Sequence, residues 1–234
     1  MTRALARREL ASGHVAWVQV SEIADGDMAG ESPVCRHLAP DSTAGASLTW
    51  LRQVHGSRVV VVNEPGGGRG AEADAAVTTK AGCVLSIRVA DCAPVVLMAE
   101  GGGLAAIHAG WRGVRDGVLE VASATLRDMV PGPQSALIGP CIHPCCYEFD
   151  PVDLAALAGD LTPAVLGATR DGQPALDLPN AVMASLEKAG VSDFEVDGAC
   201  TACDARYWSY RETGTTRRQA MIAALEPRRT ADAR

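Results

Sequence analysis

Three short β-type runs follow one another at residues 83–89, 94–98 and 104–108, and no other feature constrains the fold as strongly. They are separated by Asp-Cys-Ala at 91–93 and by Glu-Gly-Gly-Gly at 100–103. A glycine-rich break between two apolar runs is typical of a β-hairpin. The sequence therefore predicts neighbouring strands in this region, the last two of them joined as a hairpin.

The remaining elements follow from the same apolar periodicities. Strands are predicted at residues 15–20, 136–138, 194–196 and 207–210, and two more within 48–62 around Gly56; helices are predicted after Gly110 up to Pro131, at 150–157 and at 177–188. The strands come in runs rather than in strict βαβ alternation. We therefore expect an α+β fold, a single domain with a mixed β-sheet core flanked by helices.

The length and composition of the chain are those of one globular domain. It has 234 residues, of which 47% are hydrophobic and 21% are charged. Residues 1–47 lack clear periodicity and are predicted to form a variable amino-terminal segment packed on the domain. Residues 48–226 are the predicted core, and residues 227–234 are a predicted frayed tail.

Charge and hydropathy exclude two classes of partner. The formal net charge is −7 and the chain has no basic stripe, which argues against nucleic acid as a partner. The longest apolar stretch, 83–98, is interrupted by Arg88 and Asp91, so no membrane span is expected. The amino terminus shows no apolar signal region, and we expect a cytoplasmic protein.

Two histidines and a cysteine stand at breaks in the β-type runs. His55 precedes Gly56, Cys92 lies in the break after 83–89, and His108 ends the run 104–108. Two imidazoles and one thiolate suit Zn²⁺, and three protein ligands leave a fourth position open, as in catalytic sites. Taken singly, each has an ordinary alternative, because a histidine beside a glycine is often a turn residue and a lone cysteine often fills a core.

Copper is less favoured than zinc as the metal of this group. A multicopper centre needs His-x-His pairs, and none of the five histidines forms one. A single type-1 copper with Met98 as its weak axial ligand remains open.

The eight cysteines are better interpreted as thiols, metal ligands or nucleophiles than as a disulfide framework. Cys200 and Cys203 form a Cys-x-x-Cys pair, which with Cys141 and Cys145 would provide four thiolates for a structural zinc. No second pair has the spacing of a zinc ribbon, so the sequence does not favour that site.

Six motifs occur in one order along residues 48–223 and together resemble the laccase-domain family, whose members are called polyphenol oxidase or peptidoglycan editing factor. They are Gln-Val-His-Gly at 53–56, Ala-Asp-Ala-Ala-Val-Thr at 73–78, Ala-Asp-Cys-Ala-Pro at 90–94, His-Ala-Gly-Trp-Arg-Gly at 108–113, Gly-Pro-Cys-Ile with Cys-Cys-Tyr-Glu within 139–148, and Cys-Thr-Ala-Cys through Tyr-Arg within 200–211. The resemblance implies a cytoplasmic, zinc-dependent purine nucleoside enzyme. It places the zinc on His55, Cys92 and His108, which agrees with the spacing argument.

The activities that the resemblance implies are phosphorolysis of adenosine, inosine and methylthioadenosine, and deamination of adenosine. The implied partners are a purine nucleoside and orthophosphate. For deamination, a zinc-activated water would attack purine C6, although the His-x-Glu signature of the known zinc deaminases is absent. Cys92, Asp91 and His108 are the candidate catalytic residues, with Asp91 as the proton carrier.

Phosphorolysis needs groups that hold a phosphate and a nucleoside. Arg52, Gln53, Arg112, Tyr210 and Arg211 are the candidate substrate-binding residues. The arginines suit the phosphate, and Arg112 begins a predicted helix whose amide groups also favour an anion. The ring of Tyr210 is a candidate for stacking on the purine, whereas core packing is the expected role of Trp111.

Two other functions stay open at this point. In the first, Cys92 is a thiolate nucleophile and His108 its base, and the enzyme hydrolyses an amide in a peptidoglycan precursor. In the second, the chain binds nucleosides without turnover, because residues 1–47 lack the usual amino-terminal pattern of the family. The sequence leaves the oligomeric state open.

Overall fold

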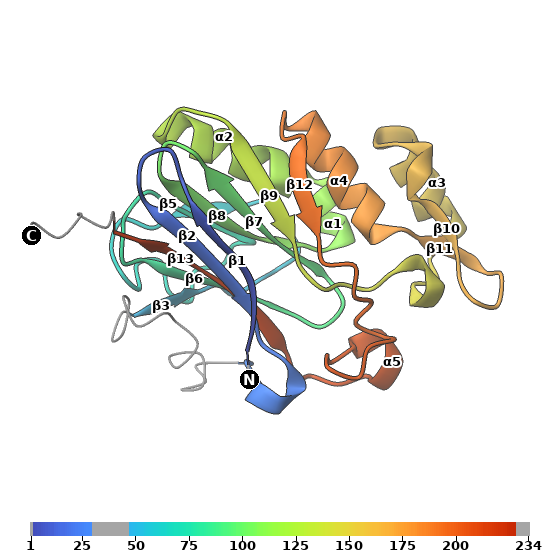
Figure 1. The fold of residues 1–234 in the computed structure, drawn as a ribbon. Helices are drawn as coiled ribbons and strands as arrows, with labels where there is room; N and C mark the ends of the chain where they lie inside the picture. The colour runs from blue at the N-terminus through green and yellow to red at the C-terminus, as the bar shows by residue number, and fades with distance from the viewer. Residues whose placement is uncertain (1, 30–46, 228–234) are drawn as a thin grey trace, which may run out of the picture.

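The computed structural model describes residues 2–29 and 47–227, which form two β-sheets and the helices that cover them (Figure 1). The five-stranded sheet has the order β1 (Arg3–Glu9), β2 (Val15–Val20), β13 (Gln219–Glu226), β6 (Val84–Val89) and β3 (Leu48–Trp50). The six-stranded sheet has the order β12 (Asp193–Val196), β9 (Gln134–Ile138), β7 (Ala93–Ala99), β8 (Gly103–Ala109), β5 (Ala75–Thr78) and β4 (Val59–Val61). Each sheet contains parallel and antiparallel pairs. The predicted α+β class with mixed sheets is confirmed.

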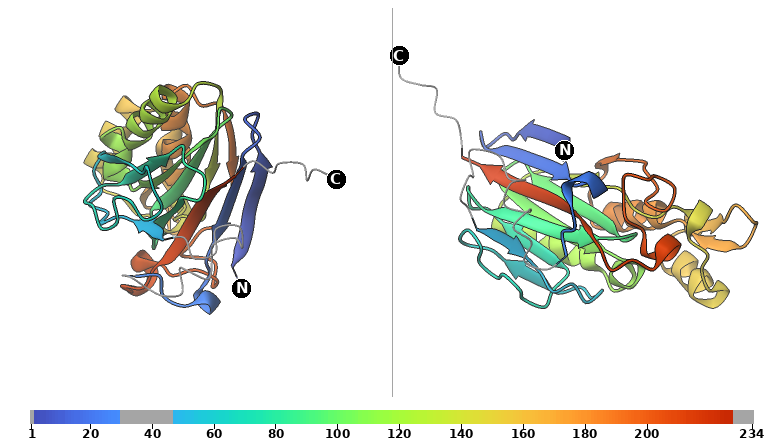
Figure 2. Two further views of the ribbon diagram at one scale, coloured as in Figure 1. Left: turned by 90° about the vertical axis from the view of Figure 1, so that its left-hand side faces the viewer. Right: turned by 90° about the horizontal axis from the view of Figure 1, so that it is seen from below.

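The two sheets pack face to face, and the helices cover the other face of the six-stranded sheet (Figure 2). Alternation along β7 shows how the sequence encodes this arrangement. Val95 and Leu97 belong to the core cluster shared with the helices, whereas Val96 and Met98 belong to the cluster shared with β2 and β13. Because both faces of β7 are covered, its sequence is apolar at every position.

Five α-helices and a small hairpin complete the described part of the chain. The helices are α1 (Trp111–Arg115), α2 (Val118–Met129), α3 (Pro151–Asp160), α4 (Leu178–Lys188) and α5 (Tyr210–Thr213), and the hairpin is β10 (Leu166–Ala168) with β11 (Pro174–Leu176). Asp150 and Asp177 accept backbone hydrogen bonds as the N-caps of α3 and α4. These two helices begin where the sequence predicts them. Every helix in the described residues falls short of the length and hydrophobicity that a membrane span requires.

Most predicted strands are confirmed, including β2 and the β7–β8 hairpin. The single helix expected between Gly110 and Pro131 is wrong, because Gly117 adopts a left-handed φ of 79° that separates α1 from α2. The strand expected at 207–210 is also wrong. The backbone of Trp208 is hydrogen bonded to the side chain of Gln219 instead of to a neighbouring strand, and α5 begins at Tyr210.

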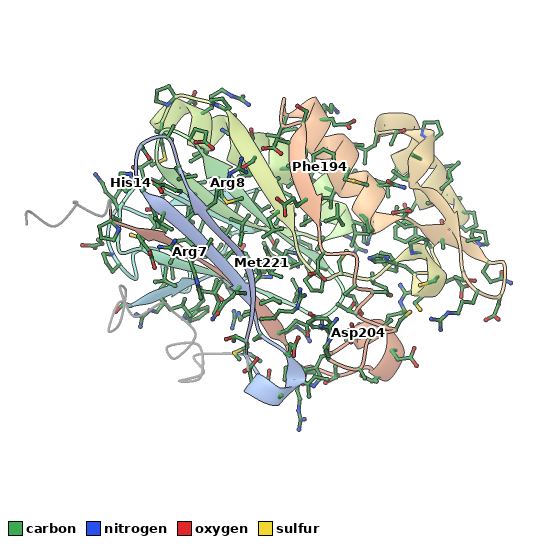
Figure 3. All side chains as sticks on the ribbon, in the orientation of Figure 1. Arg7, Arg8, His14, Phe194, Asp204 and Met221 are labelled. Atoms are coloured by element: carbon green, nitrogen blue, oxygen red, sulfur yellow. The ribbon has the colours of Figure 1, made fainter. Side chains whose placement is uncertain are left out.

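The amino-terminal strands β1 and β2 lie at the edge of the five-stranded sheet, where β2 pairs with β13. His14 lies in the turn that joins β1 to β2, on the other side of the molecule from α5 (Figure 3). Residues 30–46 of the predicted amino-terminal segment and 228–234 of the predicted tail lie outside the described residues.

Several strand ends meet at one edge of the molecule. There β7 begins opposite the end of β8, with Ala93 paired to Ala109, and β5 begins beside the same point, with Ala75 paired to Ile107. Strand β9 ends next to the start of β7. Loops that leave this edge are held by a rigid scaffold, which is the usual position for functional side chains.

Candidate active site

The three residues predicted to bind a metal come together at this edge. Cys92 directly precedes β7, His108 is the penultimate residue of β8, and His55 comes from the loop between β3 and β4. The Sγ atom of Cys92 lies 3.8 Å from Nε2 of His55. The rings of His55 and His108 are in edge contact at a centroid distance of 4.8 Å. Their potential ligand atoms all lie within 4.8 Å of one another.

Asp74 holds two members of this group in place through hydrogen bonds. Its carboxylate is fully buried and accepts hydrogen bonds from the backbone N–H groups of Val54, His55 and Gly56, which fixes the loop that carries His55. Nδ1 of His108 lies 2.8 Å from the same carboxylate. An imidazole held by a carboxylate at Nδ1 presents its Nε2 to a metal in a fixed orientation. Sequence reasoning gave Asp74 no role, although it stands in the Ala-Asp-Ala-Ala-Val-Thr motif.

The donor set fits a divalent metal of borderline softness. Tetrahedral Zn²⁺ takes nitrogen ligands at about 2.0–2.1 Å and sulfur at about 2.3 Å, so a bound sulfur and nitrogen lie roughly 3.5 Å apart. The observed separation of 3.8 Å between Cys92 and His55 is close to that value. His55 is exposed and Cys92 is half-buried, so small molecules from solvent can reach this group.

In the metal-free protein the thiol and imidazole form an ion pair. Burial alone would raise the pKa of Cys92, but His108 and His55 outweigh it and lower the pKa from 9.0 to about 6. Burial alone would lower the pKa of His108, but the Cys92 thiolate and Asp74 raise it from 6.5 to about 9. Burial opposes ionisation of Asp74 too, yet the hydrogen bonds from His108 and Gly56 lower its pKa. These charges favour a cation at the thiolate.

The backbone around the group is unusual at two residues, and a third residue, Gly110, leaves space for the ligands. His55 and Asp91 have positive φ angles of 62° and 98°, the only non-glycine residues in the described part of the chain that do. Such conformations cost free energy and are often found at functional sites. A Cβ on Gly110 would lie 2.9 Å from Cδ2 of His55 and 3.1 Å from Sγ of Cys92. Only glycine leaves room for these two ligands.

Asp91 connects the start of β7 to the carboxy-terminal part of the chain. One carboxylate oxygen accepts a hydrogen bond of 2.8 Å from the hydroxyl of Thr201, and the other accepts one of 2.7 Å from the backbone N–H of Arg211. Its carbonyl oxygen accepts a hydrogen bond from the N–H of Ile142. Asp91 therefore holds α5 and two loops against the metal-binding group.

The group lies in the wall of a cavity of about 600 Å³, a size that is ordinary for small-molecule sites. The residues that line it are Ala29, Arg52, Gln53, His55, Arg88, Val89, Ala90, Asp91, Cys92, His108, Trp111, Arg112, Tyr147, Tyr210, Thr216 and Arg218. Four of them are arginines and only one is acidic. The cavity therefore attracts anions and offers aromatic rings to a flat ligand.

Two of the predicted substrate-binding residues are already engaged within the protein. Arg52 forms an exposed ion pair with Glu72. The side-chain amide of Gln53 donates to the carbonyl of Arg88 and accepts from its N–H, which ties the loop before His55 to β6. Arg112 is exposed, with its guanidinium 4.4 Å from the ring of Trp111. The helix that carries Arg112 is shorter than predicted: α1 has only five residues, so its dipole contributes less to anion binding than a long helix would.

Tyr210 lines the cavity and is exposed, whereas Arg211 does not line it. The Arg211 guanidinium donates to the carbonyl of Glu148 and lies 4.9 Å from the ring centre of Tyr147. The structure adds Tyr147, Arg88 and Arg218 to the cavity wall, which sequence reasoning missed. Arg88 is the only charged residue of β6, and this was a usable signal.

Met98 does not complete a copper site. It is buried between the two sheets with β2 and β13 residues and lies outside the cavity that contains His55, Cys92 and His108. The type-1 copper arrangement with Met98 as axial ligand is therefore wrong.

Comparison with known proteins places this geometry in a family. The sequence profile of a family described as multi-copper polyphenol oxidoreductase laccase matches residues 32–226. The chain belongs to this family. Despite the copper in that description, the described residues bring together a His₂Cys group suited to a single ion, and the whole sequence has no His-x-His pair.

Relatives in the family have names that refer to nucleosides. The chain is 36% identical over 224 residues to a protein named purine nucleoside phosphorylase from Streptomyces coelicolor, a match that covers 92% of each chain. It is 33% identical over 218 residues to a protein of the same name from Mycobacterium bovis, covering 86% of this chain and 84% of the relative.

Solved structures share the fold. The crystal structure of YlmD from Geobacillus stearothermophilus is 28% identical in sequence and superposes with a TM-score of 0.73, covering 92% of this chain and 93% of that one. The Neisseria meningitidis protein NMB0706 is 22% identical with a TM-score of 0.75, covering 91% and 95%, and supports the fold alone.

Proposed function

We propose that the chain is a metal-dependent purine nucleoside phosphorylase that acts on adenosine, inosine and methylthioadenosine. The observation that carries the proposal is the His55–Cys92–His108 group in the wall of a cavity lined by arginines and aromatic rings. The relatives named purine nucleoside phosphorylase support the same reaction class. The arginines of the cavity suit the phosphate anion, and its aromatic rings suit the flat purine of the nucleoside.

The phosphate is proposed to bind on the arginine side of the cavity. Arg112 is exposed there and has no carboxylate partner among the ion pairs of the described residues. Arg218 lines the same cavity, with one guanidinium nitrogen donating to the carbonyls of Thr215 and Arg217. Arginines form strong, bidentate hydrogen bonds to phosphate oxygens. Arg52 would contribute once it turns from Glu72.

The nucleoside base is proposed to bind against the aromatic side of the cavity. Tyr210 is exposed at the rim, and Tyr147 lies deeper, half-buried, with its pKa raised by burial. A neutral phenol donates a hydrogen bond to a ring nitrogen or stacks on the purine. Trp111 packs edge-on against Phe149 at 5.1 Å, which matches its expected role in packing.

In phosphorolysis a phosphate oxygen forms a bond to C1′ of the ribose while the bond from C1′ to the purine nitrogen breaks, giving ribose 1-phosphate and a free base. The arginines hold the attacking phosphate and offset charge in the transition state. The base leaves with the electron pair and takes a proton, for which Asp91 is the proposed carrier. Zn²⁺ on His55, Cys92 and His108 would supply a Lewis acid at the cavity wall.

Deamination of adenosine is the second proposed activity of the same site. Asp91 is the proposed proton carrier here as well, because it lines the cavity directly before Cys92; it would take a proton from the attacking water and pass it to the departing ammonia. The test for both activities is incubation of zinc-loaded protein with adenosine, with and without phosphate. Adenine that forms only with phosphate supports phosphorolysis, and inosine supports deamination. The absence of both products would contradict the proposal.

One observation favours a second candidate function. The metal-free site contains a thiolate–imidazolium pair, Cys92 with His108, and a buried carboxylate, Asp74, that orients the imidazole. Cysteine hydrolases use the same arrangement, in which a thiolate nucleophile contacts an imidazole base that a third group orients. An amide hydrolase acting on peptidoglycan precursors would work without metal and would trap an electrophilic substrate analogue on Cys92. If zinc abolishes the trapping and the zinc-loaded protein catalyses phosphorolysis, the amide hydrolase function is excluded.

A further inference from the structure

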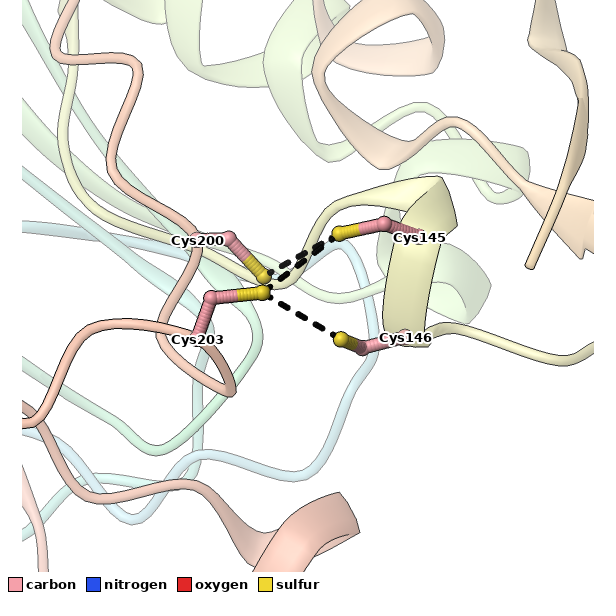
Figure 4. A group of neighbouring side chains, drawn as sticks. All are labelled: Cys145, Cys146, Cys200 and Cys203. Carbon is pink, nitrogen blue, oxygen red and sulfur yellow. Dashed lines mark hydrogen bonds between the residues drawn. The ribbon is translucent and has the colours of Figure 1, made fainter. Parts of the chain in front are cut away.

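A second group of metal-binding side chains lies next to the cavity but outside it. Sγ of Cys203 is 3.6 Å from Sγ of Cys145 and 3.3 Å from that of Cys146, and Sγ of Cys145 is 3.8 Å from that of Cys200 (Figure 4). All four sulfurs lie within 4.8 Å of one another. Cys141, which sequence reasoning grouped with three of them, is instead buried in the core beneath the helices.

These separations match a tetrahedral metal–thiolate centre. Sulfur ligands at about 2.3 Å from Zn²⁺ lie roughly 3.8 Å from one another at the corners of a tetrahedron. The three distances given above, 3.3 to 3.8 Å, are equal to or slightly shorter than that edge length. Four thiolates without a carboxylate or imidazole are the ligand set of structural zinc, and they leave no open position for chemistry.

Disulfides explain the same cluster less well. All four cysteines are free thiols in the structure. Cys203 lies about equally close to Cys145 and Cys146, which are adjacent in the chain, so neither is singled out as its covalent partner. A metal uses all four sulfurs at once, whereas a pair of disulfides would require two specific pairings of these neighbours.

The backbone around the sulfurs resembles that of a thiolate site. Cys145 and Cys146 end a single 3₁₀ turn, Pro144–Cys146, and the segment from Cys200 to Cys203 closes on itself through the N–H of Cys203 and the carbonyl of Cys200. N–H groups point to the sulfurs: the backbone of His143 donates to Cys200 at 3.4 Å. Arg170 donates to Cys203 at 2.8 Å. Such donors offset the negative charge of a four-thiolate centre.

The cluster joins two loops that both reach the site: the first contributes Tyr147 to the cavity wall, and the second contacts Asp91. Tyr147 follows Cys146 directly and lines the cavity. Thr201 follows Cys200 and donates its hydroxyl to Asp91, the residue before Cys92. Few backbone hydrogen bonds connect the two loops, among them the one from the N–H of Thr201 to the carbonyl of Cys141. A cross-link at the cysteines would fix both loops.

We propose that Cys145, Cys146, Cys200 and Cys203 bind one structural Zn²⁺ that fastens these two loops together beside the cavity. Binding displaces the thiol protons to solvent and leaves the oxidation state of every sulfur unchanged. The site is separate from the His55–Cys92–His108 group and does not depend on the nucleoside function proposed above.

The test separates the two metal sites by mutation. In a His55→Ala/Cys92→Ser variant, loaded with Zn²⁺ and then desalted, we expect about one zinc per chain, with X-ray absorption showing four sulfur neighbours at about 2.3 Å. A variant free of zinc, zinc with nitrogen or oxygen neighbours, or an intact mass reduced by a disulfide would overturn the proposal. If that variant fails to fold, X-ray absorption of the zinc-loaded wild-type chain decides: zinc with, on average, more sulfur than nitrogen neighbours is expected, and zinc bound mainly by nitrogen, or no zinc, contradicts the site.

A converse variant tests the cysteines themselves. Cys146→Ser/Cys203→Ser should lose one zinc ion and keep the other, and amide hydrogen exchange should accelerate within residues 141–147 and 200–204. The matched control is Cys83→Ala, which removes a buried thiol in a different core cluster and should keep both ions. Equal zinc content in the double variant and the control would overturn the proposal.

Discussion

Nδ1 of His108 lies 2.8 Å from a carboxylate oxygen of Asp74, and both side chains are almost completely buried. The same carboxylate holds the loop of His55 through three backbone N–H groups. Asp74 thus fixes two of the three candidate metal ligands, which come from parts of the chain more than 50 residues apart. These contacts explain why a buried position carries a carboxylate.

Asp74→Asn should weaken zinc binding by about 10–100-fold, because the amide no longer stabilises His108 in its metal-binding orientation. Its NH₂ group would also face backbone donors, so the free energy of unfolding should fall by roughly 1–3 kcal/mol. Zinc affinity is measured by competition with a chelator. The control is Asp116→Asn, an exposed acid paired with Arg115. Equal affinities for the two variants would show that Asp74 does not position the site.

Gly110→Ala should displace His55 and Cys92 and weaken zinc binding, since a Cβ there would approach both side chains at about 3 Å. Gly159→Ala is the matched control. Gly159 lies within α3, and a Cβ at this position would meet no other atom within 4 Å, so alanine there should raise helix stability by up to about 1 kcal/mol. Zinc content after desalting separates the two, and a Gly110 variant that retains full zinc content would refute the steric argument.

Alkylation of Cys92 in metal-free protein should follow a pKa of about 6. The thiolate is the reactive form, so the rate should be nearly constant above pH 7 and fall about tenfold for each pH unit well below 6. Peptide mapping is required, because the pKa of Cys203 is also lowered, despite the opposing effect of its burial. Buried Cys83, whose pKa is raised by burial, is the unreactive control. A midpoint near pH 9 for the alkylation of Cys92 would contradict the ion pair with His108. Bound zinc should protect Cys92 from alkylation.

Arg112→Ala should raise the KM for phosphate by about 10–100-fold, the loss expected for a charge-assisted hydrogen bond of roughly 1.5–3 kcal/mol. The KM for the nucleoside should change little. Arg115→Ala is the control, because Arg115 also lies over Trp111 but pairs with Asp116 and does not line the cavity. Steady-state kinetics with varied phosphate tests this, and equal effects of both substitutions would remove Arg112 from the phosphate site.

The sequence predicts local structure and ligand identity better than the long-range arrangement. Short apolar runs bounded by glycine-rich or polar breaks identify β2, β6, β7 and β8, because those patterns depend on residues close in the chain. Strand β1 was missed, since it is an edge strand with four exposed or half-exposed arginine and glutamate side chains and little apolar alternation. Strand β13, although buried at almost every position, was missed too.

The candidate site shows the same division. His55, Cys92 and His108 were predicted because each stands at a strand break, and the structure brings them together. The partners of Asp91 come from residues 110 and 120 positions away, and no spacing rule connects such distant segments. The grouping of Cys146 rather than Cys141 with Cys200 depends on the direction of side chains in one irregular loop, which the sequence pattern does not specify.

The most direct test of the proposed function is product analysis with zinc-loaded protein, its metal content verified, incubated with adenosine and orthophosphate. We expect free purine base and ribose 1-phosphate in equal amounts, formed only when phosphate is present and lost in Cys92→Ala. Protein with a full His55–Cys92–His108 site that forms neither free base nor inosine would contradict a metal-dependent nucleoside phosphorylase.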